Sequence, residues 1–309
     1  MKQVKNVATM SVYQFMGQFP DEQSAQEYLE NRRWGKNGRS CPHCLSTRTV
    51  VVKSQKPMPY RCQECRSHFS VRTGTILAES KIPLHKWLFA IYLMTTARKG
   101  ISSIQLSKEL GVTQKTAWFL SHRIREAYDL HNDGGLLGAN VEVDEVYIGG
   151  KEKNKHANKR NHSGRGPSGK QAVVGLKERG GRVKAFPVQG TEKIDLQTAI
   201  LENVKRGSNL YTDCHRSYLG VKGYNHFVVR HSVGEYVKGQ AHTNGIESFW
   251  ALLKRGYYGT FHHMSVKHLH RYVSEFSTRH NLGRDTLASL EAITDNFVGR
   301  RLTYKELTA

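Results

Sequence analysis

The sequence predicts a multidomain α/β (α+β) protein made of a small zinc-binding module, a helical region and a mixed-sheet domain. Three observations lead to this prediction. Two Cys-x-x-Cys pairs lie within residues 41–65, a helix-turn-helix pattern lies within 101–118, and strand-like and helical segments alternate from residue 140 onward. A chain of 309 residues is long enough for one large core and one or two small modules.

These segments divide the chain into five predicted parts. In order, they are a lead-in helix in 1–38, a zinc ribbon in 39–78, a helix-turn-helix region in 79–130, the mixed-sheet domain in 138–296 and a C-terminal tail in 297–309. Asp21, directly after Pro20, is a suitable cap for the lead-in helix. The Gly-rich stretch 131–138 interrupts the helical pattern and predicts a domain boundary.

The charge of the chain predicts a polyanionic partner. Lys and Arg number 47 against 26 Asp and Glu, a net charge of +21, and the positive charge runs through every segment. Double-stranded DNA fits this distribution better than a membrane surface does. The longest apolar run, 87–94, is too short to cross a bilayer, and the N-terminus lacks the order of a signal peptide. We therefore expect a cytoplasmic protein.

Four of the five cysteines predict a zinc site. Cys41, Cys44, Cys62 and Cys65 form two Cys-x-x-Cys pairs, and two such knuckles complete a tetrahedral site with a folding contribution of about 10 kcal/mol or more. Four thiolates leave no position for a substrate, so this single Zn²⁺ is expected to be structural. The alternatives are a redox-active Cys pair and a site in which a nearby histidine replaces one cysteine.

Residues 101–118 have the pattern of a helix-turn-helix. Gly111 suits the turn and Thr113 the start of the second helix, whose inward face would be formed by Ala117, Leu120 and Ile124. The polar residues of that helix remain for the major groove and its flanking phosphates. The expected DNA-contacting residues are Gln114, Lys115, Thr116, Arg123 and Arg125, with His122 beside them. The alternative is a helical hairpin that only packs against the rest of the protein.

The C-terminal half predicts an RNase H-like fold. Strands are expected at 141–148, 172–176, 183–188, 209–213 and 226–231, and helices at 195–204 and 243–256. Strand, strand, strand, helix, strand, strand, helix is the order of that fold. Residues 151–170, between the first two strands, are rich in Lys, Arg and Gly and predict a basic loop.

Two aspartates in this domain predict a divalent metal site. Asp144 lies within the first strand, and Asp213 ends the fourth. Neighbouring carboxylates repel one another and raise each other's pKa unless cations lie between them. Each Asp alone is compatible with an exposed strand position, but the pair favours a metal site.

The third ligand is expected from the helix at 243–256. Glu247 lies at the edge of its apolar stripe, and Lys254, seven residues later, is on the same face and able to reach a DNA phosphate. Asn244 is the alternative third ligand, although an amide neutralises less charge than a carboxylate. Three such ligands suit two Mg²⁺ (or Mn²⁺) ions about 4 Å apart, the arrangement that supports phosphoryl transfer.

The motifs resemble one family along nearly the whole chain. They are Cys41-Pro-His-Cys44, Cys62-Gln-Glu-Cys65, Phe69-Ser-Val-Arg-Thr-Gly-Thr75, Gly111-Val-Thr-Gln-Lys-Thr-Ala-Trp118, Val143-Asp-Glu-Val-Tyr-Ile-Gly-Gly150, Thr212-Asp-Cys-His-Arg-Ser-Tyr218, His242-Thr-Asn-Gly-Ile-Glu-Ser-Phe-Trp250 and Arg300-Arg-Leu-Thr-Tyr-Lys305. Together they resemble bacterial insertion-sequence DDE transposases with an N-terminal zinc ribbon and an RNase H-like catalytic domain, a group related to Merlin elements.

The resemblance implies a Mg²⁺-dependent transposase that binds the terminal inverted repeats of its element and joins them to target DNA. It also implies a homodimer or higher homo-oligomer on DNA and a nucleoid-associated location in a bacterium. In this group the third position is sometimes described as Asn with a following Lys, so Asn244 and Glu247 both stay open. The alternative functions are a DNA-binding regulator with an inactive RNase H-like domain and a nuclease that cuts without joining.

Overall fold

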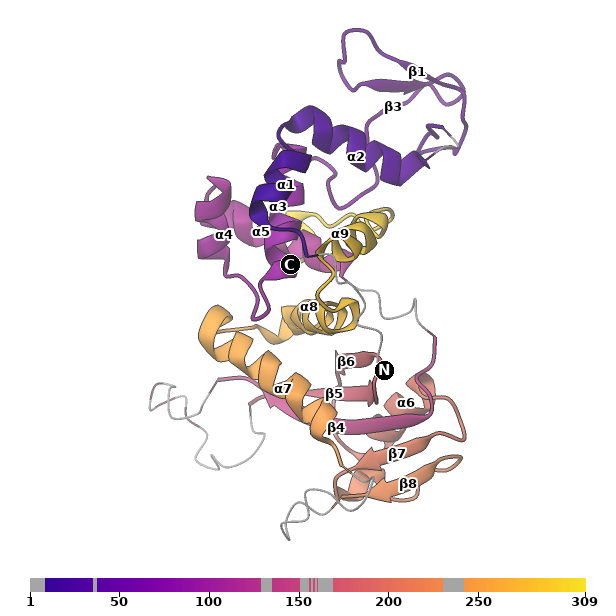
Figure 1. Cartoon of the computed structure of the whole chain (residues 1–309), viewed down its shortest axis with the longest axis vertical. Coiled ribbons are helices and arrows are strands. Elements are labelled where there is room, and N and C mark those ends of the chain that lie inside the picture. Colours follow the sequence, from indigo (N-terminus) through magenta and orange to yellow (C-terminus); the bar gives the residue numbers. More distant parts are fainter. Residues whose placement is uncertain are drawn as a thin grey trace. The chain divides into compact units, whose positions relative to one another are not determined.

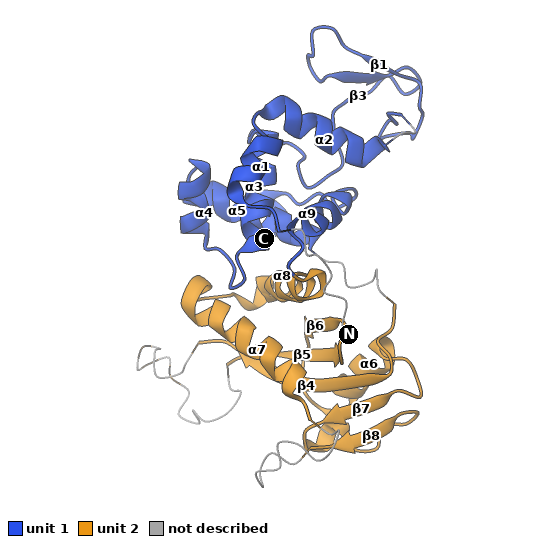
Figure 2. Ribbon diagram, viewed as in Figure 1, with its two compact units in different colours: residues 1–128, 284–309 blue, residues 129–283 orange. Residues whose placement is uncertain are grey.

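The computed structural model describes residues 9–35, 38–128, 135–150, 169–229 and 242–309, with the single residues 156, 158 and 160. The chain forms two compact units (Figure 2). Unit 1 combines residues 1–128 with 284–309, and unit 2 is residues 129–283.

The division between the units differs from the boundary expected at residue 296. Residues 284–296 belong to unit 1 because Leu290 and Ile293, and Phe297 just beyond, are buried in its hydrophobic core. Main-chain bonds hold the same segment: the Ile76 amide donates to the Phe297 carbonyl at 3.1 Å. The expected C-terminal tail is therefore part of a folded unit.

Unit 1 is mainly helical and carries the small ribbon sheet (Figure 1). Its helices are α1 (Val12–Gln18), α2 (Glu22–Trp34), α3 (Leu84–Thr96), α4 (Ser103–Leu110), α5 (Gln114–Ala127), α9 (Thr286–Asp295) and α10 (Tyr304–Thr308). Strands β1 (Thr49–Val51), β2 (Tyr60–Cys62) and β3 (His68–Phe69) form an antiparallel sheet in that order.

Local signals in the sequence explain where the helices of unit 1 begin. Asp21 caps α2, as expected, by accepting a hydrogen bond from the Ser24 amide at 2.8 Å. Thr113 caps α5, and Gly111 adopts a left-handed conformation (φ 61°) that ends α4. Residues 1–38 contain two described helices rather than the single lead-in helix expected.

Unit 2 is built around a five-stranded mixed sheet with the order β6-β5-β4-β7-β8. The strands are β4 (Asn140–Ile148), β5 (Gln171–Glu178), β6 (Val183–Pro187), β7 (Asn209–Thr212) and β8 (Asn225–Val228). The helices are α6 (Lys193–Asn203), α7 (Asn244–Gly256) and α8 (Leu269–Leu282). Strands β4, β7 and β8 are parallel, β5 runs antiparallel to β4, and β6 runs antiparallel to β5. This order agrees with the predicted strand and helix sequence, with α8 as an added helix.

Helices cover both faces of the sheet. Val141 and Val143 of β4 share one core with Leu196 and Ile200 of α6. The alternate residues of β4 lie on the opposite face, where α7 and α8 pack, because neighbouring strand residues point to opposite sides. Asp144 is on this second face, beneath α7.

Two expectations fall partly outside the described residues. Most of the basic loop 151–170 and the end of the strand expected at 226–231 are not among them. Among the helices that the structure describes, none is long and apolar enough to cross a membrane.

Candidate active site and zinc centre

The four predicted cysteines come together in the ribbon of unit 1. Their sulfur atoms all lie within 4.8 Å of one another, with Cys41 Sγ 3.6 Å from Cys65 Sγ and Cys44 Sγ 3.6 Å from Cys62 Sγ. In the described parts of the chain, this is the one group of three or more Cys, His, Asp or Glu residues with ligand atoms so close. No histidine replaces a cysteine, so the donor set suits a structural Zn²⁺.

The two knuckles have the same backbone geometry. The Cys41 amide donates to the Ser46 carbonyl at 2.9 Å, and the Cys62 amide donates to the Ser67 carbonyl at 3.0 Å. Hydrogen bonds from Ser67 lower the pKa of Cys65 to about 6, whereas burial and hydrogen bonds to the other cysteines raise the pKa of Cys44 to about 12. Zinc binding would therefore release a proton from Cys44.

Helix α2 is the support of the ribbon. Its last residue, Trp34, packs edge-on against Tyr60 and Phe69, with ring centroids 5.7 and 6.2 Å away. The Tyr60 hydroxyl donates to Glu30 Oε1 on the same helix at 2.6 Å. The helix and the ribbon therefore form one structural piece.

The sheet of unit 2 places the two predicted aspartates side by side. Strands β4 and β7 are parallel, with Glu142 opposite Tyr211, and the same register continued by two residues sets Asp144 opposite Asp213. Asp213 directly follows β7, and its Oδ1 accepts a hydrogen bond from the His215 amide at 2.9 Å. Asp213 is half-buried.

The electrostatics of Asp144 show that carboxylates crowd around it. Burial raises the pKa of Asp144 to about 7, and the charges of Glu145, Asp213 and Glu247 contribute in the same direction. Among the described residues, these carboxylates do not form a group as close as the four cysteines of the ribbon. Carboxylates that act on one another in this way form a donor set that fits divalent metal ions.

Helix α7 carries the remaining predicted residues of the site. Its predicted apolar stripe is buried, whereas Asn244, Glu247 and Lys254 are exposed. The Thr243 hydroxyl donates to Glu247 Oε1 at 2.7 Å and so orients that carboxylate. Of the two candidates for third ligand, Glu247 is the one whose charge acts on Asp144.

A glycine lets α7 approach the sheet closely at this point. Gly175 of β5 is the register partner of Asp144. A Cβ atom at Gly175 would lie 2.5 Å from Trp250 Cζ2 and 2.8 Å from Ile246 Cδ1. The strand beside Asp144 must therefore lack a side chain for α7 to lie where it does.

Sequence reasoning missed two glutamates beside Asp144. Glu145 lies on the other face of β4 and accepts a hydrogen bond from the Tyr218 hydroxyl, which connects the segment after Asp213 to the first strand. Glu142 is 1% exposed and contacts the start of α7. The sequence did contain a signal for Glu142, because this carboxylate lies between two valines of a strand. A carboxylate in such a position is buried only when it has polar partners.

The first turn of α5 presents part of the expected DNA-contacting set. Gln114 and Lys115 are exposed, and Thr116 is half-buried. The Lys115 ammonium lies 4.8 Å from the centroid of the Tyr304 ring, so α10 borders this surface.

The expected exposure of Arg123 and Arg125 was wrong. Arg123 is 4% and Arg125 2% exposed, and His122 is fully buried. The Arg123 guanidinium lies 5.1 Å from the Trp87 ring and donates to the Ala78 carbonyl at 2.6 Å, while burial lowers its pKa to about 10. Arg125 donates to Ser121 Oγ at 3.1 Å. Both long side chains serve the packing of unit 1, since their stems are apolar and each guanidinium donates to a neighbouring oxygen.

Comparison with known proteins agrees with this arrangement. Residues 135–281 match the family model described as the ISXO2-like transposase domain, and residues 20–68, which include α2, match the transposase zinc-ribbon domain.

Two curated relatives extend these matches. An uncharacterized protein in transposable element ISH50 of Halobacterium salinarum is 30% identical over 250 residues, which cover 77% of this chain and 83% of that protein. An uncharacterized transposase-like protein of Haemophilus influenzae is 32% identical over 102 residues, 32% of this chain and 81% of that protein. A zinc ribbon joined to an acidic mixed-sheet unit, together with these similarities, shows that the chain belongs to the ISXO2-like family of insertion-sequence transposases.

Proposed function

We propose that this protein is a DNA transposase that binds the terminal inverted repeats of its insertion sequence and catalyses metal-dependent strand cleavage and strand transfer. The observation that carries the proposal is the acidic cluster on the sheet of unit 2. There burial raises the pKa of Asp144 to about 7, and the charges of Asp213 and Glu247 act in the same direction. A fold gains nothing from bringing these carboxylates together unless cations bind them.

In this proposal Asp144, Asp213 and Glu247 hold two Mg²⁺ or Mn²⁺ ions. Bound cations would supply Lewis-acid stabilisation of the charge that develops on the phosphate during transfer. Asp144 and Asp213 fix the site to neighbouring strands, and Glu247 closes it from α7. The exposed ammonium of Lys254, on the same helical face as Glu247, is placed for a DNA phosphate.

The reaction proceeds in two displacements at one site. A water oxygen first attacks a phosphorus of the transposon DNA, and the bond between that phosphorus and the 3′ oxygen breaks. The water gives up a proton to solvent, and the 3′ oxygen takes up a proton, which frees a 3′-hydroxyl. The oxygen of that hydroxyl then attacks a phosphorus of target DNA and forms a new phosphodiester. The bond from this phosphorus to the 3′ oxygen of the target strand breaks, and the leaving oxygen takes up a proton in place of the one that the attacking hydroxyl loses.

DNA recognition is assigned to the exposed first turn of α5. Gln114 and Lys115, with Thr116 beside them, lie at the start of the second helix of the helix-turn-helix, the part of this motif that enters a major groove. The proposal does not give this role to Arg123 and Arg125, because both side chains are buried.

The test uses a labelled duplex of the element's terminal repeat and Mg²⁺. Asp144→Asn removes a ligand charge without changing side-chain size, so cleavage should fall by more than about 100-fold, beyond the usual cost of losing an outer-shell partner. DNA binding should stay within a factor of about two, because α5 belongs to the other unit. Glu202→Gln, an exposed change on α6, is the matched control.

The outcomes separate the candidate functions. Binding without cleavage by the wild-type protein would identify a DNA-binding regulator, and cleavage without joining would identify a nuclease. Cleavage by Asp144→Asn at the rate of Glu202→Gln would remove Asp144 from the site.

A further inference from the structure

The first turn of α7 has no capping side chain of its own. A helix begins with amide groups that lack partners within the helix, and the residue before it usually accepts from one of them. Thr243 occupies that position in α7 but makes no such side-chain bond. Its hydroxyl donates to Glu247 Oε1 at 2.7 Å instead.

Glu142, on β4, accepts the bond that a cap residue would accept. Its Oε2 receives the amide of Ile246, the third residue of α7, at 2.9 Å. A carboxylate at this position also interacts favourably with the positive end of the helix dipole. Glu142 is therefore a cap supplied by another element of the fold.

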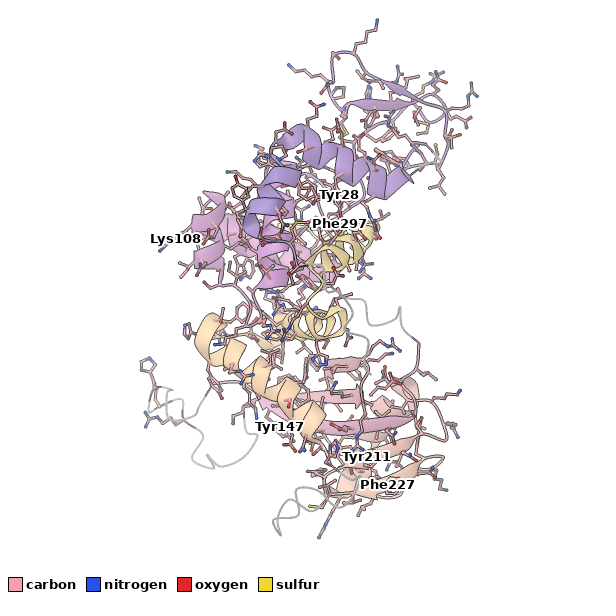
Figure 3. All side chains as sticks on the ribbon, in the orientation of Figure 1. Tyr28, Lys108, Tyr147, Tyr211, Phe227 and Phe297 are labelled. Carbon is pink, nitrogen blue, oxygen red and sulfur yellow. The ribbon has the colours of Figure 1, made fainter. Side chains whose placement is uncertain are left out.

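The other oxygen of Glu142 binds a cation that is also fixed to the sheet. Arg179 Nε donates to Glu142 Oε1 at 3.0 Å, and His242 Nδ1 lies 3.3 Å from the same oxygen. Arg179 further donates to the His242 carbonyl at 2.7 Å, and its guanidinium lies 3.8 Å above the Tyr211 ring. Tyr211 in turn stacks on Phe227 of the next strand, with centroids 5.3 Å apart (Figure 3). Arg179 thus connects the residues just before α7 to β4 through Glu142 and to β7 through Tyr211, which itself packs on β8.

A glycine makes the contact between Glu142 and α7 possible. A Cβ atom at Gly245 would lie 2.7 Å from Glu142 Oε2 and 3.0 Å from Lys177 Cε. The start of α7 therefore lies directly on the buried carboxylate, with no room for a side chain between them.

We propose that Glu142 is a positioning residue for the metal site. It caps α7 from β4, two residues from Asp144 on the same strand face, and leaves the Thr243 hydroxyl available to orient Glu247. A single strand thus supplies one ligand and fixes the helix that supplies another. The inference rests on the proposed function, because its consequence is measured on metal-dependent cleavage.

The test compares Glu142→Gln with Glu178→Gln on the terminal-repeat duplex. Glu178 is a matched control, since its Oε1 also accepts a backbone amide, that of Gly138 at 3.1 Å, but it has no part in α7. The Mg²⁺ concentration for half-maximal cleavage should rise about 10–100-fold in Glu142→Gln, as for other outer-shell partners of metal ligands, and stay unchanged in Glu178→Gln. Equal Mg²⁺ dependence in the two variants would overturn the proposal, whereas no cleavage by the wild-type protein would instead reject the proposed function.

Amide exchange gives a second readout that does not require catalysis. In the wild-type protein the Ile246 amide should exchange slowly although it lies in the first turn, and in Glu142→Gln its exchange should become at least about 10-fold faster. Fast exchange of Ile246 in the wild-type protein would overturn the proposal even if the variant does not fold. Arg179→Lys, which keeps the charge but not the forked geometry, should show an intermediate Mg²⁺ dependence.

Discussion

At the scale of single residues, the proposed metal site has two candidates for its third ligand, and they lie one helical turn apart on α7. Glu247 acts electrostatically on Asp144 and is oriented by Thr243, whereas Asn244 is exposed at the first position of α7. Glu247→Gln should therefore reduce Mg²⁺-dependent cleavage by more than about 10-fold, with partial recovery in Mn²⁺, which binds nitrogen and oxygen ligands more tightly. Asn244→Ala should retain most activity. Loss of activity in Asn244→Ala with full activity in Glu247→Gln would reverse the assignment.

A second residue-scale prediction concerns the close contact at Gly175. Its substitution by Ala introduces a Cβ that would overlap the Trp250 ring, so α7 must move away from the strand or the strand must bend. Overpacking of this kind costs about 1–3 kcal/mol, and we expect that loss in the free energy of unfolding measured with urea. Cleavage should fall as well, because Glu247 moves with α7.

Gly150→Ala is the control for this prediction. Among the described residues, none lies within 4 Å of a Cβ atom at Gly150, so the unfolding free energy of Gly150→Ala should differ from that of the wild-type protein by less than about 0.5 kcal/mol. A loss of stability equal to that of Gly175→Ala would show that the contact with Trp250 is unimportant.

At the scale of elements, α8 is joined to the sheet by a half-buried pair that responds to pH. Lys177 Nζ of β5 lies 3.1 Å from His280 Nε2 of α8, and burial, with the charge of Lys177, lowers the pKa of His280 to about 4. The unfolded chain takes up a proton on this imidazole near pH 6.5, but the folded chain does so only near pH 4. The stability that depends on neutral His280 is therefore complete above pH 6.5 and is lost as the pH falls from 6.5 to 4.

His280→Gln should remove that part of the acid sensitivity. A Gln oxygen can still accept the Lys177 bond but does not titrate. Between pH 6.5 and 4, the free energy of unfolding of the variant should therefore fall by on the order of 2 kcal/mol less than that of the wild-type protein. Thermal unfolding across this range measures the difference. His215→Gln, at an exposed position, serves as control, and parallel curves for wild type and His280→Gln would contradict the prediction.

The elements also show what the sequence could predict. The stripe of Ile246, Phe249, Trp250 and Leu253 has the period of a helix, and α7 is present with these residues buried. The cap at Thr113 and the Cys-x-x-Cys spacing likewise depend on local chemistry, and both are confirmed. The side-by-side placement of Asp144 and Asp213 followed from a recognised strand order.

Features that depend on distant contacts were not predictable in this way. In the sequence, Arg123 and Arg125 look like an exposed basic face. In the fold, the Trp87 ring of α3 and the Ala78 carbonyl contact Arg123, and Ser121 accepts a hydrogen bond from Arg125. The role of Glu142 depends on an amide 104 positions later in the chain. Neither helical period nor residue type contains that information.

At the scale of the whole molecule, unit 1 depends on a segment that follows unit 2. Leu290, Ile293 and Phe297 are buried in its core, and the loss of one large apolar core residue costs about 2–5 kcal/mol. A chain ending at Gly283 should therefore lose the unfolding transition of unit 1, because the combined cost equals the whole stability of a typical domain. Unit 2, which is continuous in sequence, should keep its own transition.

Calorimetry and DNA-binding anisotropy measure this outcome. The shortened chain should show one transition instead of two and bind a terminal-repeat duplex at least about 100-fold more weakly, a loss of 2.7 kcal/mol or more. Wild-type affinity in the shortened chain would show that unit 1 does not need residues 284–309 to bind DNA.

The return of residues 284–309 to unit 1 also sets an order of events during synthesis. On the ribosome, α9 emerges only after every strand of unit 2, so contacts such as Thr75 with Val298 join parts of the chain made far apart in time. A nascent or prematurely terminated polypeptide would therefore lack a completely folded unit 1. Under the proposed function, incomplete translation products would then fail to bind transposon ends, and each molecule able to bind an end would already contain unit 2.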